Sequence, residues 1–116
     1  MVARVSFERF PREQHDEGLQ IVVAELLPAL RRAPGYRGGF VLADGKPGTL
    51  LLVVHWETEE AADAASAQPD VIAAFVKLSA LRLMIDSRKI YEVVAGDEIV
   101  QQPDEGTGLS GSKGAE

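Results

Sequence analysis

The segment TLLLVVHWE, residues 49–57, is the feature that most constrains what this chain can fold into. In a strand, Leu51 and Val53 point one way, while Leu50, Leu52 and Val54 point the other way. A strand with helices on one face and water on the other should instead alternate apolar and polar side chains. The segment therefore predicts a strand that is covered on both faces. Since no further segment of the chain is left for the second face, we expect a second subunit there, which makes a homodimer.

Short segments rich in apolar residues and bounded by turn residues predict strands, and the first of these segments alternates imperfectly between apolar and polar residues. In the first of them, Ala3, Val5 and Phe7 share one face. A turn with two glycines, DGKPG, joins the second and third segments and predicts an antiparallel hairpin. The predicted strands are residues 2–10, 36–43, 49–57 and 87–95.

Apolar residues at three- and four-residue spacing predict helices between these strands. The first is 12–33, in which Pro28 should kink the last turn or end the regular helix early because it has no backbone N–H. The second is 59–68, with Thr58 as its N-cap, and the third is 69–84. The order β-α-β-β-α-α-β is that of an α+β ferredoxin-like sandwich.

The chain of 116 residues suffices for one domain, which we place at residues 1–95. Residues 96–116 are rich in Gly and Ser and hold five acidic residues and one basic residue. We expect a mostly disordered acidic tail there, in which the pair Ile99-Val100 could dock on a neighbour.

Composition argues against several classes of function. The chain has no cysteine, so it has no disulfide, thiol nucleophile or thiolate metal site. The net charge of −6 and the lack of a basic stripe argue against a nucleic-acid partner. The longest apolar run, Leu50 to Val54, is far shorter than the roughly 20 residues that span a membrane. No signal peptide precedes the first strand, so we expect a cytoplasmic protein with no membrane partner.

Two segments resemble the antibiotic biosynthesis monooxygenase (ABM) family: APGYRGGFVL, residues 33–42, and VVHWETEEAADAA, residues 53–65. The first has the family's Pro-Gly after a helix, and the second its strand that ends in Trp and an acid before a capped helix. The resemblance covers about residues 2–95. It implies a dimeric α+β barrel with a pocket between the helices and the sheet of each subunit. It also implies oxidation of aromatic or quinol-like substrates by O₂ without a metal, flavin or other cofactor.

This chain departs from the family in three ways. Oxygenases of this type often place an Asn in the pocket, and the chain has none. Relatives often carry a His in the helix after the Trp-acid motif, where Ala65 is the best match. A haem-degrading branch needs a His ligand on a helix, whereas the two histidines here are His15, at a helix start, and His55, on a strand. Together with acidic neighbours, His15 has metal-ligand chemistry, but adjacent helical residues do not face one another, so we predict no metal site.

The candidate site residues follow from their chemistry. A neutral His55 could accept a proton from a phenol, and Tyr36 and Tyr91 could act as bases or hydrogen-bond a quinone oxygen. Arg82, which interrupts the apolar pattern of 69–84, could stabilise an anion. The flat side chain of Trp56 could stack on an aromatic ligand, with Phe75 as a second apolar contact. Each residue also has a plain structural interpretation as a packing, capping or interface group.

Since His55 and Trp56 are neighbours in a strand, they should point to opposite faces. Three functions stay open at this point. The first is a cofactor-independent monooxygenase. The second is a non-catalytic ligand-binding or assembly dimer, and the third is a cyclase or isomerase on the same fold.

Overall fold

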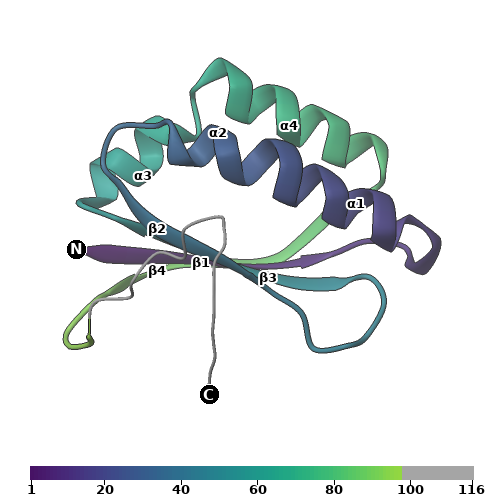
Figure 1. Ribbon diagram of the computed structural model, residues 1–116, viewed down its shortest axis with the longest axis horizontal. Coiled ribbons are helices and arrows are strands. Elements are labelled where there is room, and N and C mark those ends of the chain that lie inside the picture. The colour runs from purple at the N-terminus through teal and green to yellow at the C-terminus, as the bar shows by residue number, and fades with distance from the viewer. Residues whose placement is uncertain (98–116) are drawn as a thin grey trace, which may run out of the picture.

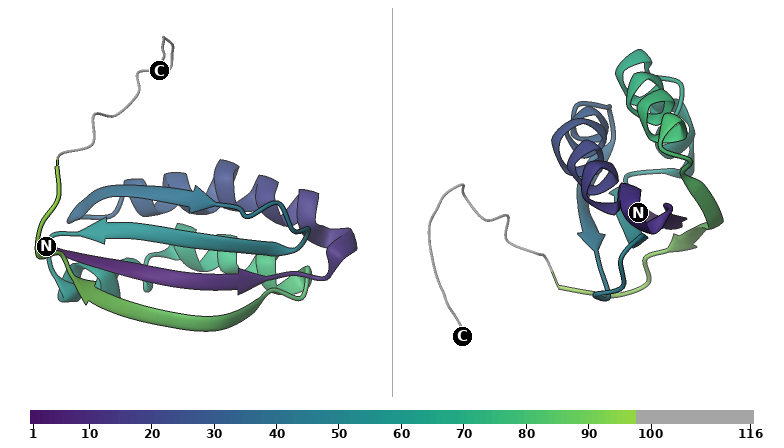
Figure 2. Two further views of the ribbon diagram at one scale, coloured as in Figure 1. Left: turned by 90° about the horizontal axis from the view of Figure 1, so that it is seen from below. Right: turned by 90° about the vertical axis from the view of Figure 1, so that its right-hand side faces the viewer.

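A computed structural model of the chain describes residues 1–97. Four strands form one antiparallel sheet in the order β2-β3-β1-β4. Seen from below, all four strands lie side by side on an open face (Figure 2, left). The strands are β1 (Val2–Arg9), β2 (Tyr36–Leu42), β3 (Thr49–Trp56) and β4 (Met84–Glu92).

The helices all cover the other face of the sheet (Figure 1). This arrangement confirms the predicted α+β ferredoxin-like sandwich, with its order β-α-β-β-α-α-β. No helix within residues 1–97 is long and apolar enough to cross a membrane. Most of the predicted acidic tail, 98–116, lies outside the described residues. The helical elements are η1 (Arg12–Gln14), α1 (His15–Ile21), the π-helical η2 (Val22–Leu26), α2 (Leu27–Arg31), α3 (Glu59–Ala65) and α4 (Pro69–Ala80).

We predicted that Pro28 would either kink the last turn or end the regular helix early. The helix does not end early, since η1, α1, η2 and α2 follow one another without a break as far as Arg31. A wider π turn directly precedes the proline, and the Leu27 N–H donates to the oxygen of Val22, five residues back. The local change in hydrogen-bond spacing accommodates the residue that cannot donate. The helix therefore accommodates the proline by a π turn and continues, instead of ending there.

The boundary between the third helix and the fourth strand was predicted wrongly. Helix α4 ends at Ala80, not near 84, and β4 begins at Met84, not at 87. Arg82 takes a left-handed φ of 65°. The Arg82 N–H donates to Ser79 O (2.9 Å) and the Leu83 N–H to Leu78 O (3.2 Å), which is the pattern of a Schellman ending. The apolar pattern in the sequence continues beyond the end of the helix, because Leu81 and Leu83 still pack against the core.

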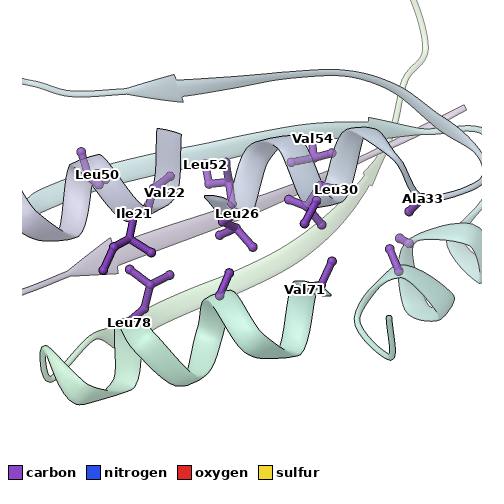
Figure 3. Packing of buried hydrophobic residues seen from close by; sticks show 14 of the residues in the cluster. Ile21, Val22, Leu26, Leu30, Ala33, Leu50, Leu52, Val54, Val71 and Leu78 are labelled. Carbon is purple, nitrogen blue, oxygen red and sulfur yellow. The ribbon is translucent and has the colours of Figure 1, made fainter. Parts of the chain in front are cut away.

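The core lies between the helices and the sheet (Figure 3). From β3, the inward residues are Leu50, Leu52, Val54 and Trp56, each at most 5 % exposed. They meet Val22, Leu26, Leu30, Val71 and Leu78 from the helices. The outward residues Leu51 and Val53 are half-buried, as expected of a strand that is apolar on both faces.

Strand β1 has the opposite polarity to the one expected of a strand under helices. Ser6 pairs with the inward Leu52, so Arg4, Ser6 and Glu8 face the helices. Val5 pairs with the outward Val53, so Ala3, Val5 and Phe7 face the open side. The polar row of this strand is therefore inside the molecule and the apolar row is outside.

Both edge strands carry an irregularity that the central pair lacks. The ladder of β1 and β3 is regular from Val2↔Trp56 to Arg9↔Thr49. Strand β2 shifts register at Arg37, and β4 shifts register at Asp86. The shift in β4 keeps Ile85, opposite Glu8, and Arg88, opposite Ser6, on the inner face with their partners.

Gly35 lies where the two segments that carry the family resemblance, residues 33–42 and 53–65, contact each other. Its φ is 88°, and a Cβ at this position would lie 2.6 Å from the Cβ of Ala61 in α3. The Glu57 N–H donates to Gly35 O at 2.8 Å. The turn after the first helix therefore needs glycine for its conformation and for its close contact with the helix that follows β3.

Candidate functional site

A small pocket of about 30 Å³ lies between the sheet and helices α3 and α4. Its volume suits roughly two water molecules. The apolar wall comes from the core and includes the rings of Trp56 and Phe75. The polar wall consists of Arg4 and Ser6 from β1, Ser66 after α3 and Arg88 from β4. An apolar cavity with a few convergent polar groups is the usual form of a small-molecule site.

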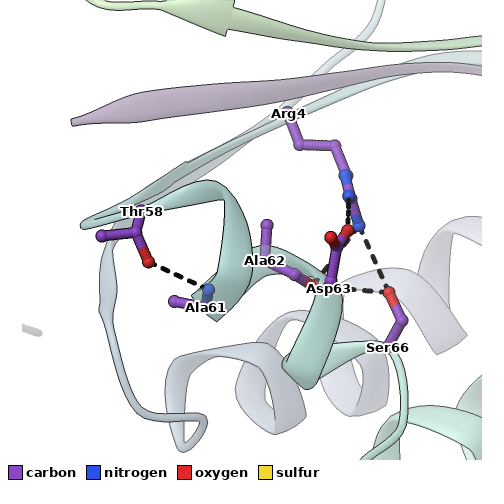
Figure 4. A network of polar contacts seen from close by, with 6 residues as sticks. All are labelled: Arg4, Thr58, Ala61, Ala62, Asp63 and Ser66. Carbon is purple, nitrogen blue, oxygen red and sulfur yellow. Dashed lines mark hydrogen bonds and ion pairs between the residues drawn. The ribbon is translucent and has the colours of Figure 1, made fainter.

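Arg4 is anchored to α3 (Figure 4). Its Nη2 donates to Asp63 Oδ1 at 2.7 Å, and its Nη1 donates to Ser66 Oγ at 3.3 Å and Ala62 O at 3.4 Å. The same helix begins at Thr58, whose side chain accepts from the Ala61 N–H, which confirms the predicted N-cap. The Nε of Arg4 is buried and has no hydrogen-bond acceptor among the described residues. The guanidinium is therefore fixed in orientation and keeps one unused donor.

Glu8 lies two residues from Ser6 on the same inner face of β1. Its side chain is fully buried, and neither carboxyl oxygen has a hydrogen-bond partner within residues 1–97. Burial raises the pKa of Glu8 from 4.5 to about 7, although the charge of Arg88 acts in the opposite direction. A carboxyl group with such a pKa can give or take a proton near neutral pH.

Phe75 and Arg88 separate the pocket from the surface. The Cζ of Arg88 lies 5.9 Å from the centre of the Phe75 ring, within the range of a cation–π contact. Phe75, Arg88 and Ser66 also line a wider outer groove of about 390 Å³, together with Ile72, Val76 and Ser79. The shared residues show that the groove and the pocket lie next to each other.

The predicted site residues divide between the two faces of the sheet. Trp56 and Phe75 both line the pocket. Tyr36 packs edge-on against Trp56, with ring centres 5.8 Å apart, but does not line the pocket. His55 and Tyr91 lie on the outer face, both opposite Ala3. Within one subunit, these two residues are on the other side of the sheet from the pocket.

The position predicted for Arg82 was wrong. We placed it on an apolar helix face, but it is an exposed residue beyond the end of α4. It lines a separate groove at the end of the sheet, with Arg9 and Met84. It therefore takes no part in the pocket.

The polar residues of the pocket escaped the sequence analysis. The alternation of β1 separates Arg4, Ser6 and Glu8 from the apolar row, but alternation alone does not tell which row faces the helices. The signal that the sequence did offer was the other row of β1. Ala3, Val5 and Phe7 are as apolar as residues that face a core, although they lie on the outer face. Within residues 1–97, no group of three or more metal-ligating side chains is placed to hold a metal ion.

The outer face of the sheet forms a second region of interest. It exposes Phe7 by 41 % and Tyr91 by 51 %, and the ring of Phe40 meets that of His55 at 6.5 Å. Large exposed apolar side chains gathered on one face are typical of an interaction surface. The apolar and aromatic residues on this face are Ala3, Val5, Phe7, Phe40, Leu42, Leu51, Val53, His55 and Tyr91, and the polar residues Arg9, Thr49, Ser87 and Lys89 also lie on it.

Comparison with known proteins agrees with this geometry. Residues 1–77 match the family described as antibiotic biosynthesis monooxygenase. Among curated proteins, none matched the chain. The fold resembles crystal structures of proteins described as antibiotic biosynthesis monooxygenases. The one from Chloroflexus aurantiacus J-10-fl is 23 % identical with a TM-score of 0.72, and covers 85 % of this chain and 98 % of its own.

A second such protein, from Deinococcus radiodurans, is 24 % identical with a TM-score of 0.72, over 87 % of this chain and all of its own. The fold is also similar to that of SnoaB, a cofactor-independent oxygenase from Streptomyces nogalater. SnoaB is 19 % identical with a TM-score of 0.70, over 82 % of this chain and 94 % of its own. At these identities the likeness establishes the fold.

Proposed function

This chain belongs to the antibiotic biosynthesis monooxygenase family, and on that premise we propose that it oxidises a small aromatic or quinol-like substrate with O₂, without a cofactor. The observation that carries the proposal is the wall of the pocket, which combines two aromatic rings with two arginines and two serines. The fold shared with SnoaB, a cofactor-independent oxygenase, supports the same reaction type.

A quinol can supply all the electrons that this reaction needs. Loss of a phenolic proton gives an electron-rich anion that can react with O₂. One oxygen atom then replaces a ring hydrogen, the other leaves as water, and the quinol becomes a hydroxyquinone. The protein has to bind the ring, stabilise the developing oxyanion and keep bulk water out.

The pocket residues divide these tasks. Trp56 and Phe75 provide apolar surfaces for a flat ring. Arg4 and Arg88 supply positive charge for the oxyanion, and Arg4 is held in place by α3. Because the pocket has only about 30 Å³, an aromatic ring requires the Phe75 side chain to move toward the outer groove. Tyr36 supports Trp56 from behind.

The proposal includes a homodimer that is formed through the outer face of the sheet. That face is apolar on β1, β2 and β3, and a sheet with water on one side should be polar there. A second copy would cover it with the same apolar side chains, as an isologous interface requires. In such a dimer, His55 and Tyr91 would lie at the contact between the subunits.

The test is O₂ uptake with 1,4-naphthohydroquinone and substituted hydroquinones, measured above the uncatalysed rate. We expect uptake with the wild-type chain, and a fall in kcat/KM of about a hundredfold for Arg88→Gln, since one oxyanion donor is lost. The matched control is Arg37→Gln, an arginine of edge strand β2 whose partner is Glu57 at 3.4 Å. Uptake that never exceeds the uncatalysed rate would contradict the proposal.

The small volume of the pocket favours one alternative, a non-catalytic ligand-binding or assembly dimer. A chain of this kind would bind aromatic molecules, or none, without consuming O₂. A cyclase or isomerase would instead turn over its substrate under nitrogen. Running the same substrates with and without O₂ therefore separates the three functions.

A further inference from the structure

Glu8 is an ionisable group that has no hydrogen-bond partner among the described residues, although the charge of Arg88 acts on it. It is fully buried, and both carboxyl oxygens lack hydrogen bonds among the described residues. Burying a carboxyl group in this way costs folding free energy, and an apolar side chain would avoid that cost. A purely structural role does not account for a glutamate at this position.

The inner row of β1 leads from Glu8 to the pocket. Side chains two residues apart on one strand face are separated by roughly 7 Å. Ser6 is the next residue of the row, and it lines the pocket, while Glu8 lies behind it. The flexible side chain of Glu8 can span that distance, and the hydroxyl of Ser6 can both accept and donate a proton.

Two positive charges face the same space. Arg88 is the partner of Ser6 across the ladder of β1 and β4, and Arg4 lies on the other side of Ser6 in the row. The inward residues of β3 are all apolar, and the buried residues of α1, η2 and α4 carry no titratable group. Arg88 is therefore the charged group that acts on Glu8, and Arg4 and Arg88 are the charged groups that line the pocket around a ligand.

We propose that Glu8 is the proton acceptor of this pocket, and that it takes the proton of a bound phenol through the hydroxyl of Ser6. The phenol O–H bond breaks and its proton passes to Ser6 Oγ, while the proton of Ser6 passes to the carboxylate of Glu8. The products are a phenolate, which faces Arg4 and Arg88, and a neutral glutamic acid. No electrons are transferred, so the step needs no oxidant. It rests on the proposed function, for which it supplies the reactive anion.

The test counts protons while 1-naphthol binds under nitrogen. At pH 8, free naphthol is mostly neutral and Glu8 is mostly ionised. Calorimetry in buffers of different ionisation enthalpy gives the protons released, and the absorption spectrum reports naphtholate. For the wild-type chain we expect bound naphtholate and no net proton release, because Glu8 keeps the proton. For Glu8→Gln we expect one proton released for each naphtholate bound, or binding as neutral naphthol without the naphtholate spectrum.

A second variant separates the path from the acceptor. Ser6→Ala should keep the wild-type end point but slow the appearance of naphtholate at least tenfold in stopped-flow measurements. The matched controls are Glu25→Gln, a surface glutamate paired with Lys77, and Ser87→Ala, which lies on the outer face opposite Phe7. Both controls should give wild-type readings.

Three results would overturn the inference. The first is that the wild-type chain does not bind naphthol. The second is that the wild-type chain releases one proton per naphtholate bound. The third is that Glu8→Gln, like the wild-type chain, binds naphtholate with no net proton release. Because these measurements need no O₂, the outcome is independent of oxygenation. A chain that transfers the proton but consumes no O₂ would contradict the proposed function and support the role of Glu8. Oxygen uptake with an unchanged Glu8→Gln proton count would do the reverse.

Discussion

The two faces of β1 have exchanged the roles that strand faces have in an ordinary two-layer domain. The middle of the row under the helices is polar, with Arg4, Ser6 and Glu8, whereas Ala3, Val5 and Phe7 on the open side are apolar. Strand β3, beside it in the sheet, is apolar on both faces. The two strands therefore have different roles. Strand β3 supplies packing to both faces, while β1 supplies polar groups to an interior pocket and apolar groups to an outer surface.

The largest effect that tests this comparison is expected at two adjacent residues on opposite faces. Trp56 is 2 % exposed and packs in the core, so Trp56→Ala should lower the free energy of unfolding by about 3–5 kcal/mol. His55→Ala, on the outer face, should cost less than about 1 kcal/mol. Urea denaturation at one fixed protein concentration measures both. Equal losses would show that His55 is packed as tightly as Trp56.

A charge on the outer face tests whether a second copy covers it. Val53 lies opposite Val5 in the middle of that face. We expect a dimer for the wild-type chain, and for Val53→Asp a dissociation constant raised at least about a hundredfold, or about 3 kcal/mol, because the carboxylate would be buried without a partner. Sedimentation velocity over a range of concentrations gives the constant.

The control for that experiment is Val76→Asp, which places the same charge on the exposed side of α4. It should leave the dimer intact. A wild-type chain that stays monomeric at every concentration would contradict the prediction, as would equal dissociation of both variants.

The inner row predicts a pH dependence of stability with a definite sign. Since the pKa of Glu8 is raised from 4.5 to about 7, the folded chain holds a proton in this range that the unfolded chain has released. Stability therefore falls as the pH rises through the range, by about 1.4 kcal/mol per unit and about 3 kcal/mol at most. Glu8→Gln should remove this loss. The free energy of unfolding at pH 5 and pH 8, for both chains, gives the difference, and equal slopes would contradict the burial of an ionisable Glu8.

The smallest effect on stability is expected at Asp63, whose exposed side chain pairs with Arg4 of the inner row. The Asp63 side chain is 64 % exposed, so the ion pair with Arg4 should contribute less than about 1 kcal/mol. Asp63→Asn should lower the thermal midpoint slightly, and less so at high salt. Asp70→Asn, which removes the exposed pair with Arg32, is the matched control and should behave alike. A much larger loss for Asp63 would show that Arg4 needs this anchor to keep the pocket folded.

Much of the fold could be predicted because it depends on local patterns. The period of the side chains indicated the strands and helices in their order, and Thr58 marked a helix start. That β3 is apolar on both faces could also be predicted, because successive side chains of a strand point to opposite faces and the apolar run is continuous. The end of α4 did not, because Arg82 takes the left-handed position where glycine is the usual signal, and apolar residues continue beyond it.

The pocket could be predicted only in part. Trp56 and Phe75 were selected for their chemistry, and the structure places both in its wall. The polar residues were missed because the direction in which β1 faces depends on its neighbours, β3 and β4, and not on its own alternation. Arg88 is an exposed residue of an edge strand, and nothing in its own segment indicates that it also lines the pocket. Contacts between distant segments decide these positions, and no single segment contains that information.

The register shifts in β2 and β4 have a consequence for how copies of this protein can assemble. Both rims of the sheet are irregular, at Arg37 and at Asp86, so neither offers a long, straight row of free backbone groups to a further strand. Growth of the sheet from edge to edge, which has no natural end, is therefore disfavoured. Contact through a face related by a two-fold axis is complete after two copies. The irregular rims favour an assembly that closes on itself over a filament.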